Sequence, residues 1–203
     1  NNLIVRNAID GISQSQATLV YFSSCAVFGE KNNQTNIHEN SPLSPTSFYG
    51  EHKITAEHLI REILPQESYL VLRPPLIYSI SQTIGYHPGG FIASAETSGK
   101  IQLWGDGEEI REMVDVSDSV NITINLLTNH ARGVYNMVSG SSYSYIDCAN
   151  CIRNYLLDTE IMHKSRTAGK VDHSYNNSKL LSKINSYRFL SPFESISKYF
   201  ESK

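Results

Sequence analysis

Apolar residues in the first third of the chain follow helical and strand periods in turn. From residue 2 to 12 they recur every three to four positions, which is the helical period. Residues 17–22 form a short apolar run rich in β-branched and aromatic residues, typical of a strand buried on both faces. The helical period returns over 48–64 and stops at Pro65, and 69–73 is a second apolar run. Helix, strand, helix, strand predicts a parallel sheet covered by helices.

Beyond residue 79 the pattern is less regular, and shorter elements are expected. Residues 158–203 are polar with short amphipathic pieces, and no internal repeat or low-complexity tract is found. The periods predict helices over 91–98, from about 117 and over 145–157, and strands over 101–104 and 133–138.

Composition is that of an ordinary soluble protein and excludes several classes. Of the 203 residues, 40% are hydrophobic and 18% charged, and 17 Lys and Arg against 20 Asp and Glu give a formal net charge of −3. No block of basic residues is present to neutralise the phosphates of a nucleic acid or an anionic membrane. No apolar run approaches the roughly 20 residues of a membrane helix. We therefore expect neither nucleic-acid nor membrane partners.

The cysteines indicate a reducing compartment. Only Cys25, Cys148 and Cys151 occur, which is no disulfide framework, so we expect a cytoplasmic protein. Zinc needs four ligands, and neither a second cysteine pair nor a histidine set accompanies the CxxC spacing. We therefore expect no metal site, and Cys148 and Cys151 are expected to pack in the core. The chain begins with Asn1 and not Met, which suggests part of a longer protein.

Tyr49 and Lys53 are the first candidates for chemistry. Four positions apart on a helix, a phenol and an ammonium group project from one face. A free Tyr has a pKa of about 10, and a cation within about 4 to 6 Å favours the phenolate. Such a tyrosine can move a proton near neutral pH.

The same spacing occurs twice more, so context must decide. Tyr175/Lys179 and Tyr199/Lys203 lie in the polar final segment with no predicted strand end nearby, and we interpret both pairs as surface-helix positions. Tyr49, in contrast, follows the loop that leaves the strand at 17–22. In parallel sheets, ligands bind outside the carboxyl ends of the strands. Ser24 follows that strand, and its hydroxyl either orients the oxygen whose proton Tyr49 moves or only caps a turn.

In these segments the chain resembles the extended short-chain dehydrogenase/reductase family, which includes nucleotide-sugar epimerases, dehydratases and 4-keto-sugar reductases. Residues 22–29 resemble the family's serine-containing strand end, with Ser24 at the catalytic Ser/Thr position, and Tyr49 and Lys53 match its YxxxK motif. The remaining matches occur in family order: Leu72 to Tyr78, Trp104 to Arg111, Val114 to Asp118, and Gly133 to Asn136.

The resemblance implies a fold and a set of roles. We expect an α/β fold: residues 1–78 as the second half of a Rossmann-type doubly wound parallel sheet, and 79–203 as a small mixed α/β substrate-binding region from which 114–138 returns to the sheet. It implies NAD or NADP as cofactor, a nucleotide-sugar substrate, and a homodimer formed through helices 2–12 and 48–64. It assigns catalysis to Ser24, Tyr49 and Lys53. It assigns cofactor binding to Phe22, Ser23, Tyr49, Lys53, Pro74 and Leu76, and substrate binding to Ser24, Cys25, Ala26 and Arg111.

Departures from the family pattern narrow the expectation. The glycine-rich GxxGxxG turn that binds the dinucleotide pyrophosphate is absent, so we expect the N-terminal half of the cofactor fold to be missing and this chain alone to be inactive. Cys25 and Ala26 replace the Asp-Glu pair of family dehydratases, which argues against dehydration. Leu76 replaces a frequent substrate-binding Asn, which leaves the sugar open.

The sequence therefore predicts the C-terminal portion of a nucleotide-sugar epimerase or 4-keto-sugar reductase. Two alternatives stay open: a same-fold oxidoreductase acting on a non-sugar carbonyl or alcohol, and a non-enzymatic nucleotide-sensing protein of this fold. Arg111 separates the first alternative from the main hypothesis, because a substrate without a diphosphate gives this arginine no partner. Retention of Ser24, Tyr49 and Lys53 disfavours the second.

Overall fold

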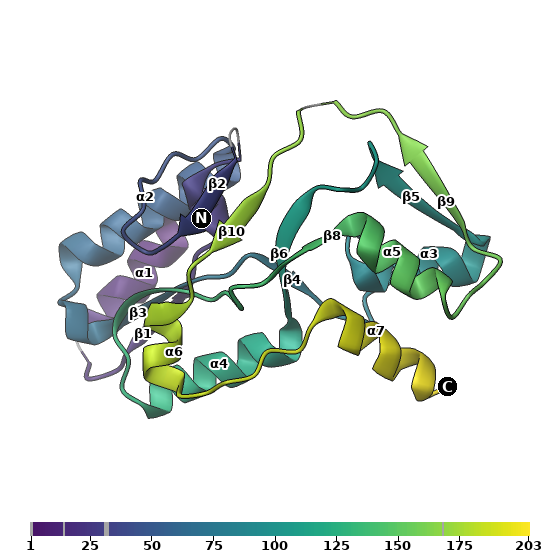
Figure 1. Cartoon of the computed structure of the whole chain (residues 1–203). Coiled ribbons are helices and arrows are strands. Elements are labelled where there is room, and N and C mark those ends of the chain that lie inside the picture. The colour runs from purple at the N-terminus through teal and green to yellow at the C-terminus, as the bar shows by residue number, and fades with distance from the viewer. Residues whose placement is uncertain (1, 14, 31–32, 168) are drawn as a thin grey trace.

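A three-stranded parallel sheet organises the first part of the molecule (Figure 1). The order is β1 (Leu19–Phe22), β3 (Tyr69–Arg73), β7 (Gly133–Asn136), and β1–β3 and β3–β7 are both parallel. The structure is a computed structural model that describes residues 2–13, 15–30, 33–167 and 169–203.

Helices cover both faces of this sheet, as its apolar strands predict. Tyr69 and Val71 of β3 pack with α1 (Asn2–Ser13) and α2 (Phe48–Ile63). Leu70 and Leu72 point the other way and pack with α4 (Val116–Thr128) and α6 (Ser178–Ile184). All five residues of β3 are buried because side chains alternate between two covered faces.

A mixed sheet and a separate strand pair form the second part. In the mixed sheet, β6 (Ile110–Asp115) pairs in parallel with β4 (Leu76–Tyr78) and antiparallel with β8 (Ser142–Ser144). The separate pair joins β5 (Lys100–Trp104) to β9 (Glu160–Lys164) in parallel.

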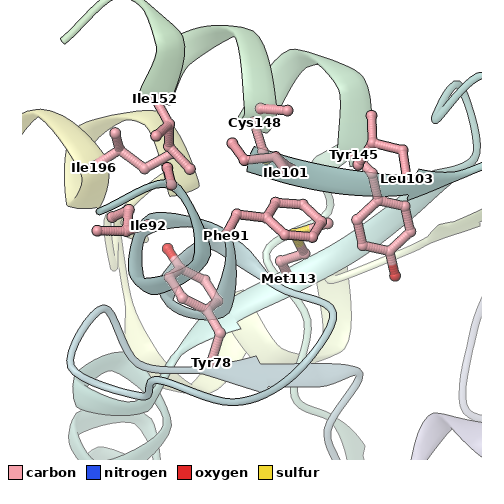
Figure 2. Close-up of a cluster of buried hydrophobic side chains, with 12 residues drawn as sticks. Tyr78, Phe91, Ile92, Ile101, Leu103, Met113, Tyr145, Cys148, Ile152 and Ile196 are labelled. Carbon is pink, nitrogen blue, oxygen red and sulfur yellow. The ribbon is translucent and has the colours of Figure 1, made fainter. Parts of the chain in front are cut away.

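Three helices enclose the core of this second part, seen in Figure 2: α3 (Pro88–Ser98), α5 (Tyr145–Arg153) and α7 (Pro192–Glu201). Cys148 is fully buried in this core and Cys151 packs against it, so the expectation of core cysteines is confirmed. Among the described residues, no group of His, Cys, Asp or Glu is arranged to hold a metal ion.

A third unit joins segments that are far apart in the chain. Strand β2 (Gln34–Ile37) pairs in parallel with β10 (His173–Tyr175). In Figure 1, β10 lies between the α1/α2 side and the mixed sheet. Short 3₁₀ helices, η1 (Cys25–Phe28) and η2 (Gln66–Ser68), follow β1 and precede β3.

The sequence predicted the elements with a clear apolar period or run and missed those without one, including β6 and α7. The strand over 69–73 and the helix over 48–64 match β3 and α2 to within one residue. The helix expected over 145–157 is wrong at its end, because α5 stops at Arg153. Strands β2, β4, β6, β8, β9 and β10 were not predicted. In the described part of the chain, no helix combines the length and apolarity that crossing a bilayer requires.

Candidate functional site

One cavity of about 360 Å³ brings together most of the residues that the sequence nominated. On one side it is bordered by η1 and the start of α2, and on the other by β6 and β10. The nominated residues that line it are Ser24, Cys25, Ala26, Tyr49, Leu76 and Arg111.

Ser24 borders the cavity and also caps η1. Its Oγ accepts a hydrogen bond from the Ala26 N–H at 3.1 Å, so the turn-capping role is real. A hydroxyl that accepts one bond still has its own hydrogen to donate. Ser24 can therefore cap the turn and donate to a ligand oxygen at the same time.

The start of α2 places Tyr49 at the cavity. The Ser47 side chain caps the helix by accepting from the Gly50 N–H at 3.2 Å, and Tyr49 follows with 55% of its surface exposed. Gly50 allows α2 to lie directly against η1, because a Cβ at this position would meet the Ala26 carbonyl oxygen at 2.6 Å. The close contact is what brings Tyr49 and Ser24 to one cavity.

Lys53 lies one turn further on the same face of α2. Its ammonium group donates to the Phe22 carbonyl at 2.6 Å and stands 5.5 Å from the centre of the Tyr49 ring and 5.0 Å from that of Tyr21. Burial lowers the pKa of Lys53. Lys53 borders an adjoining hollow of about 290 Å³, which Tyr49 also lines, and not the cavity itself.

The other residues that the sequence predicts to bind the cofactor differ in their exposure. Phe22 is 41% exposed at the end of β1. The Ser23 side chain, by contrast, is 2% exposed and its hydroxyl donates to Glu57 at 2.6 Å, so it points into the interior. Its backbone N–H donates to the Leu72 carbonyl at 2.7 Å, so neither donor of Ser23 is directed at a ligand. Pro74 is buried and its carbonyl accepts from Cys25 at 2.8 Å, while its neighbour Pro75, which the sequence did not single out, lines the cavity.

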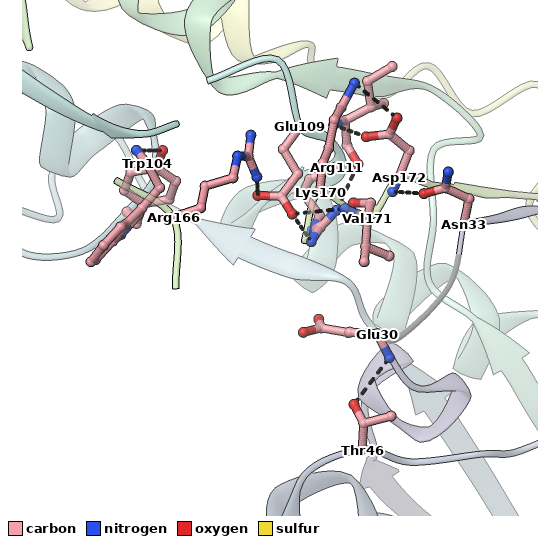
Figure 3. A network of polar contacts seen from close by, with 12 residues as sticks. Glu30, Asn33, Thr46, Trp104, Glu109, Arg111, Arg166, Lys170, Val171 and Asp172 are labelled. Atoms are coloured by element: carbon pink, nitrogen blue, oxygen red, sulfur yellow. Dashed lines mark hydrogen bonds and ion pairs between the residues drawn. The ribbon is translucent and has the colours of Figure 1, made fainter. Parts of the chain in front are cut away.

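Arg111 is partly neutralised inside the protein. Its guanidinium donates to Glu109 at 2.7 Å, to the Ile110 carbonyl at 3.2 Å and to the Val171 carbonyl. Glu109 lies between Arg111 and Arg166, which approaches the second oxygen of Glu109 at 3.4 Å (Figure 3). Sequence reasoning missed Arg166, because it sits in the polar final segment and reaches Arg111 only through the fold.

The far wall contains further residues that the sequence did not predict. Tyr175 lies in strand β10 and lines the cavity, so its assignment to a surface helix was wrong. The spacing of Tyr175 to Lys179 gave no signal of this, because the strand exists only through its pairing with β2. Glu112, next to Arg111, is 2% exposed, and burial raises its pKa to about 7.

The comparison with protein families matches the model described as "NAD dependent epimerase/dehydratase family" over residues 1–138. A curated relative, ADP-L-glycero-D-manno-heptose-6-epimerase of Alkalilimnicola ehrlichii, is 28% identical over 158 residues, which are 70% of this chain and 48% of that protein. The chain thus spans about half or less of the length of the curated relatives it matches.

Solved structures show the same fold. MoeE5 in complex with UDP-glucuronic acid and NAD is 20% identical, with a TM-score of 0.84 over 98% of this chain and 69% of that one. RMD from Pseudomonas aeruginosa, complexed with NADPH, is 19% identical, with a TM-score of 0.83 over 98% of this chain and 72% of that one. The fold is therefore α/β of the Rossmann type found in extended short-chain dehydrogenases/reductases. With two thirds of its residues matched by the family model and this fold, the chain belongs to the NAD-dependent epimerase/dehydratase family.

Proposed function

We propose that this chain carries the substrate-binding and proton-transfer portion of an NAD(P)-dependent nucleotide-sugar epimerase or 4-keto-sugar reductase. The observation that carries the proposal is the single cavity bordered by Ser24, Tyr49 and Arg111, with Lys53 against the Tyr49 ring. These side chains come from three separate segments. Because they meet at one cavity, a single ligand can contact a proton-transfer group and an anion-binding group at the same time.

Tyr49 is the residue that takes or returns the proton of the reacting sugar hydroxyl. Its side chain is 55% exposed and lines the cavity, and the ammonium group of Lys53 stands 5.5 Å from the centre of its ring. Ser24 donates a hydrogen bond to the same sugar oxygen and so orients it. These roles require the Tyr49 phenol and the Ser24 hydroxyl to contact the same sugar oxygen, and both side chains border the same cavity.

Arg111 and Arg166 form the anion-binding end of the proposed site. Glu109 pairs with both guanidinium groups and holds them together without a ligand. A diphosphate would compete with Glu109, because planar guanidinium groups bind phosphate oxygens in pairs.

Lys53 and Tyr49 would hold the nicotinamide end of the cofactor, with the exposed Phe22 side chain beside them. Pro74 offers no hydrogen-bond donor, because proline has no backbone N–H and its carbonyl already accepts from Cys25. When bound, the nicotinamide supplies hydride transfer. The sequence has no glycine-rich turn for the pyrophosphate, and no strand among the described residues pairs with the outer edge of β1. We therefore propose that turnover requires a glycine-rich half that this chain does not contain.

Helices α1 and α2 support the proposal of a homodimer. Leu3 and Ile4 of α1 are 72% and 71% exposed, and Ile63 of α2 is 40% exposed. Burying such side chains against a second copy is favourable. Analytical ultracentrifugation of the wild-type chain and of Ile4→Glu tests this: the variant should sediment as a monomer, and equal sedimentation of both excludes this face.

The test of the function is binding of a panel of UDP-, ADP-, GDP- and dTDP-sugars by calorimetry. We expect one class to bind and Arg111→Gln to weaken it about tenfold or more, since a charge-assisted hydrogen bond contributes roughly 1.5–3 kcal/mol. Tyr49→Phe should keep binding but abolish turnover once the glycine-rich half is supplied. Because Glu109 already neutralises Arg111, a substrate without a diphosphate is the second candidate; binding of none of the panel would favour it and contradict the sugar proposal.

A further inference from the structure

Glu112 is a buried carboxyl group that the proposed reaction does not use. It lies on β6 directly after Arg111, borders the cavity, and is 2% exposed. In the antiparallel ladder it stands opposite Ser142 of β8. Its surroundings link the two strands that form the far wall of the cavity.

One oxygen of Glu112 holds a backbone turn. Oε1 accepts from the N–H and the hydroxyl of Ser139 and from the Gly140 N–H at 3.0 Å. Gly140 has φ 78°, a conformation that favours glycine, and a Cβ there would lie 2.9 Å from the side-chain nitrogen of Asn177. The turn therefore has little freedom to shift while these contacts persist.

The same turn is tied to the opposite strand. The side-chain amide of Asn177, two residues after β10, donates to the Ser139 carbonyl at 2.5 Å. The hydroxyl of Ser142 donates to the carbonyl of His173 in β10 at 3.0 Å. Contacts thus run from Glu112 through the turn to β10, and both strands line the cavity.

The other oxygen of Glu112 is buried and has no hydrogen-bond partner within the described residues. The donors to Oε1 compensate only part of the cost of burying a charge. Burial accordingly raises the pKa of Glu112 to about 7, although the hydrogen bonds from Ser139 and Gly140 act in the opposite direction.

The titratable groups around Glu112 come from each neighbouring element. Cys25 of η1, Tyr143 of β8 and Tyr175 of β10 interact with it electrostatically, and burial raises the pKa values of all three, so they stay uncharged near neutral pH. His173 of β10 lines the same cavity, and Arg111 is turned to Glu109 and Val171.

We propose that Glu112 is a positioning residue that ties the Arg111 strand to the His173–Tyr175 strand through the Ser139–Gly140 turn, and that the tie loosens when its carboxyl group ionises. The closed arrangement binds the proton more tightly than an opened, solvated carboxyl group does. Raising the pH from the ordinary value of 4.5 through about 7 therefore favours opening. The proposal rests on the proposed function only for the choice of a nucleotide sugar as ligand.

Hydrogen exchange of the Ser139 and Gly140 amides between pH 5.5 and 8.5, corrected for intrinsic rates, tests the tie. In the wild type, protection should fall about tenfold or more across this range. In Glu112→Gln it should stay constant, because the amide is neutral and keeps the acceptor oxygen. Glu30→Gln is the matched control: Glu30 also borders the cavity but is exposed, and this variant should keep the wild-type profile.

UDP-glucose binding over the same pH range gives the second readout. Affinity should fall with rising pH in the wild type and stay constant in Glu112→Gln. Equal exchange profiles in these two proteins would overturn the positioning role. Absence of UDP-glucose binding with the expected exchange profiles would contradict this sugar nucleotide as ligand and leave the positioning role standing.

A carbon-detected titration of the wild-type Glu112 carboxyl group needs no variant. Its midpoint should lie near 7 and coincide with the change in amide protection. A midpoint near 4.5, or an exchange transition at a different pH, would also overturn the proposal.

Discussion

Glu57 of α2 and Glu112 of β6 are both buried carboxyl groups, and their pKa values move in opposite directions. Burial acts to raise both. At Glu57, Arg73 opposes it with two contacts at 2.9 and 2.6 Å, Ser23 adds a third, and the pKa of Glu57 falls below its ordinary value. At Glu112 the hydrogen-bond donors are neutral, burial prevails, and the pKa rises to about 7.

The Glu57–Arg73 ion pair is therefore expected to persist across neutral pH, whereas the contacts of Glu112 are expected to change as its carboxyl group ionises. The stabilisation from Glu57 is present above its unfolded-state pKa of about 4.5 and is lost as the pH falls through the lower folded value. The stabilisation associated with Glu112 is present below about 4.5 and is lost as the pH rises through about 7. We therefore expect the Ser24 side of the cavity to stay fixed across neutral pH and the Arg111 side to loosen as Glu112 ionises.

The largest expected effect comes from removing the Glu57–Arg73 ion pair. Glu57→Ala leaves the guanidinium of Arg73, itself 1% exposed, without its carboxylate, so the free energy of unfolding should fall by about 3–5 kcal/mol. Urea denaturation at pH 7 measures it. Glu62→Ala, at an exposed position of the same helix, should change stability by less than about 0.5 kcal/mol. Similar losses in both variants would contradict the buried link.

Ionisation of Glu112 predicts a pH-dependent change in the free energy of unfolding, of somewhat smaller size. A shift from 4.5 to about 7 corresponds to on the order of 3 kcal/mol, so Glu112→Gln should match the wild type near pH 4 and exceed its stability by up to that amount at pH 8. Thermal unfolding across this pH range measures the difference. Parallel stability curves for the two proteins would show that Glu112 titrates normally.

The smallest effect tests the packing of α2 against η1. Gly50→Ala places a Cβ 2.6 Å from the Ala26 carbonyl, and the helix must shift at a cost of about 1–3 kcal/mol. Gly11→Ala in α1 meets nothing within 4 Å and should stabilise by about 0.5–1 kcal/mol. Shifts of the denaturant midpoint in opposite directions from the wild type, down for Gly50→Ala and up for Gly11→Ala, support the close contact. Shifts in the same direction contradict it.

How well each side of the cavity could be predicted from sequence depends on how far apart in the chain its contacting residues lie. Strand β3 and helix α2 have strong periods of their own, so their bounds were predicted closely. Strands β2 and β10 have four and three residues, and they form because segments about 140 positions apart pair with each other. A strand this short has no periodic signal, and its stabilisation comes from its partner.

The candidate site divides in the same way. Ser24, Tyr49 and Lys53 follow one another across a single strand end and helix start, where motif and spacing indicate their chemistry. Tyr175 reaches the cavity, and Arg166 reaches Glu109 beside Arg111, only through long-range contacts of the final segment, which no local pattern encodes. Ser23 marks the opposite limit, because the sequence does not show that its side chain turns inward to Glu57.

The central claim, that one cavity joins proton transfer at Tyr49 to anion binding at Arg111, is tested most directly by a crystal structure of the chain with UDP-glucose. We expect the diphosphate in hydrogen-bond contact with Arg111 or Arg166, and a sugar hydroxyl within about 3.2 Å of the Tyr49 phenol oxygen. A ligand seated elsewhere, or a bound sugar that Tyr49 does not contact, would contradict it.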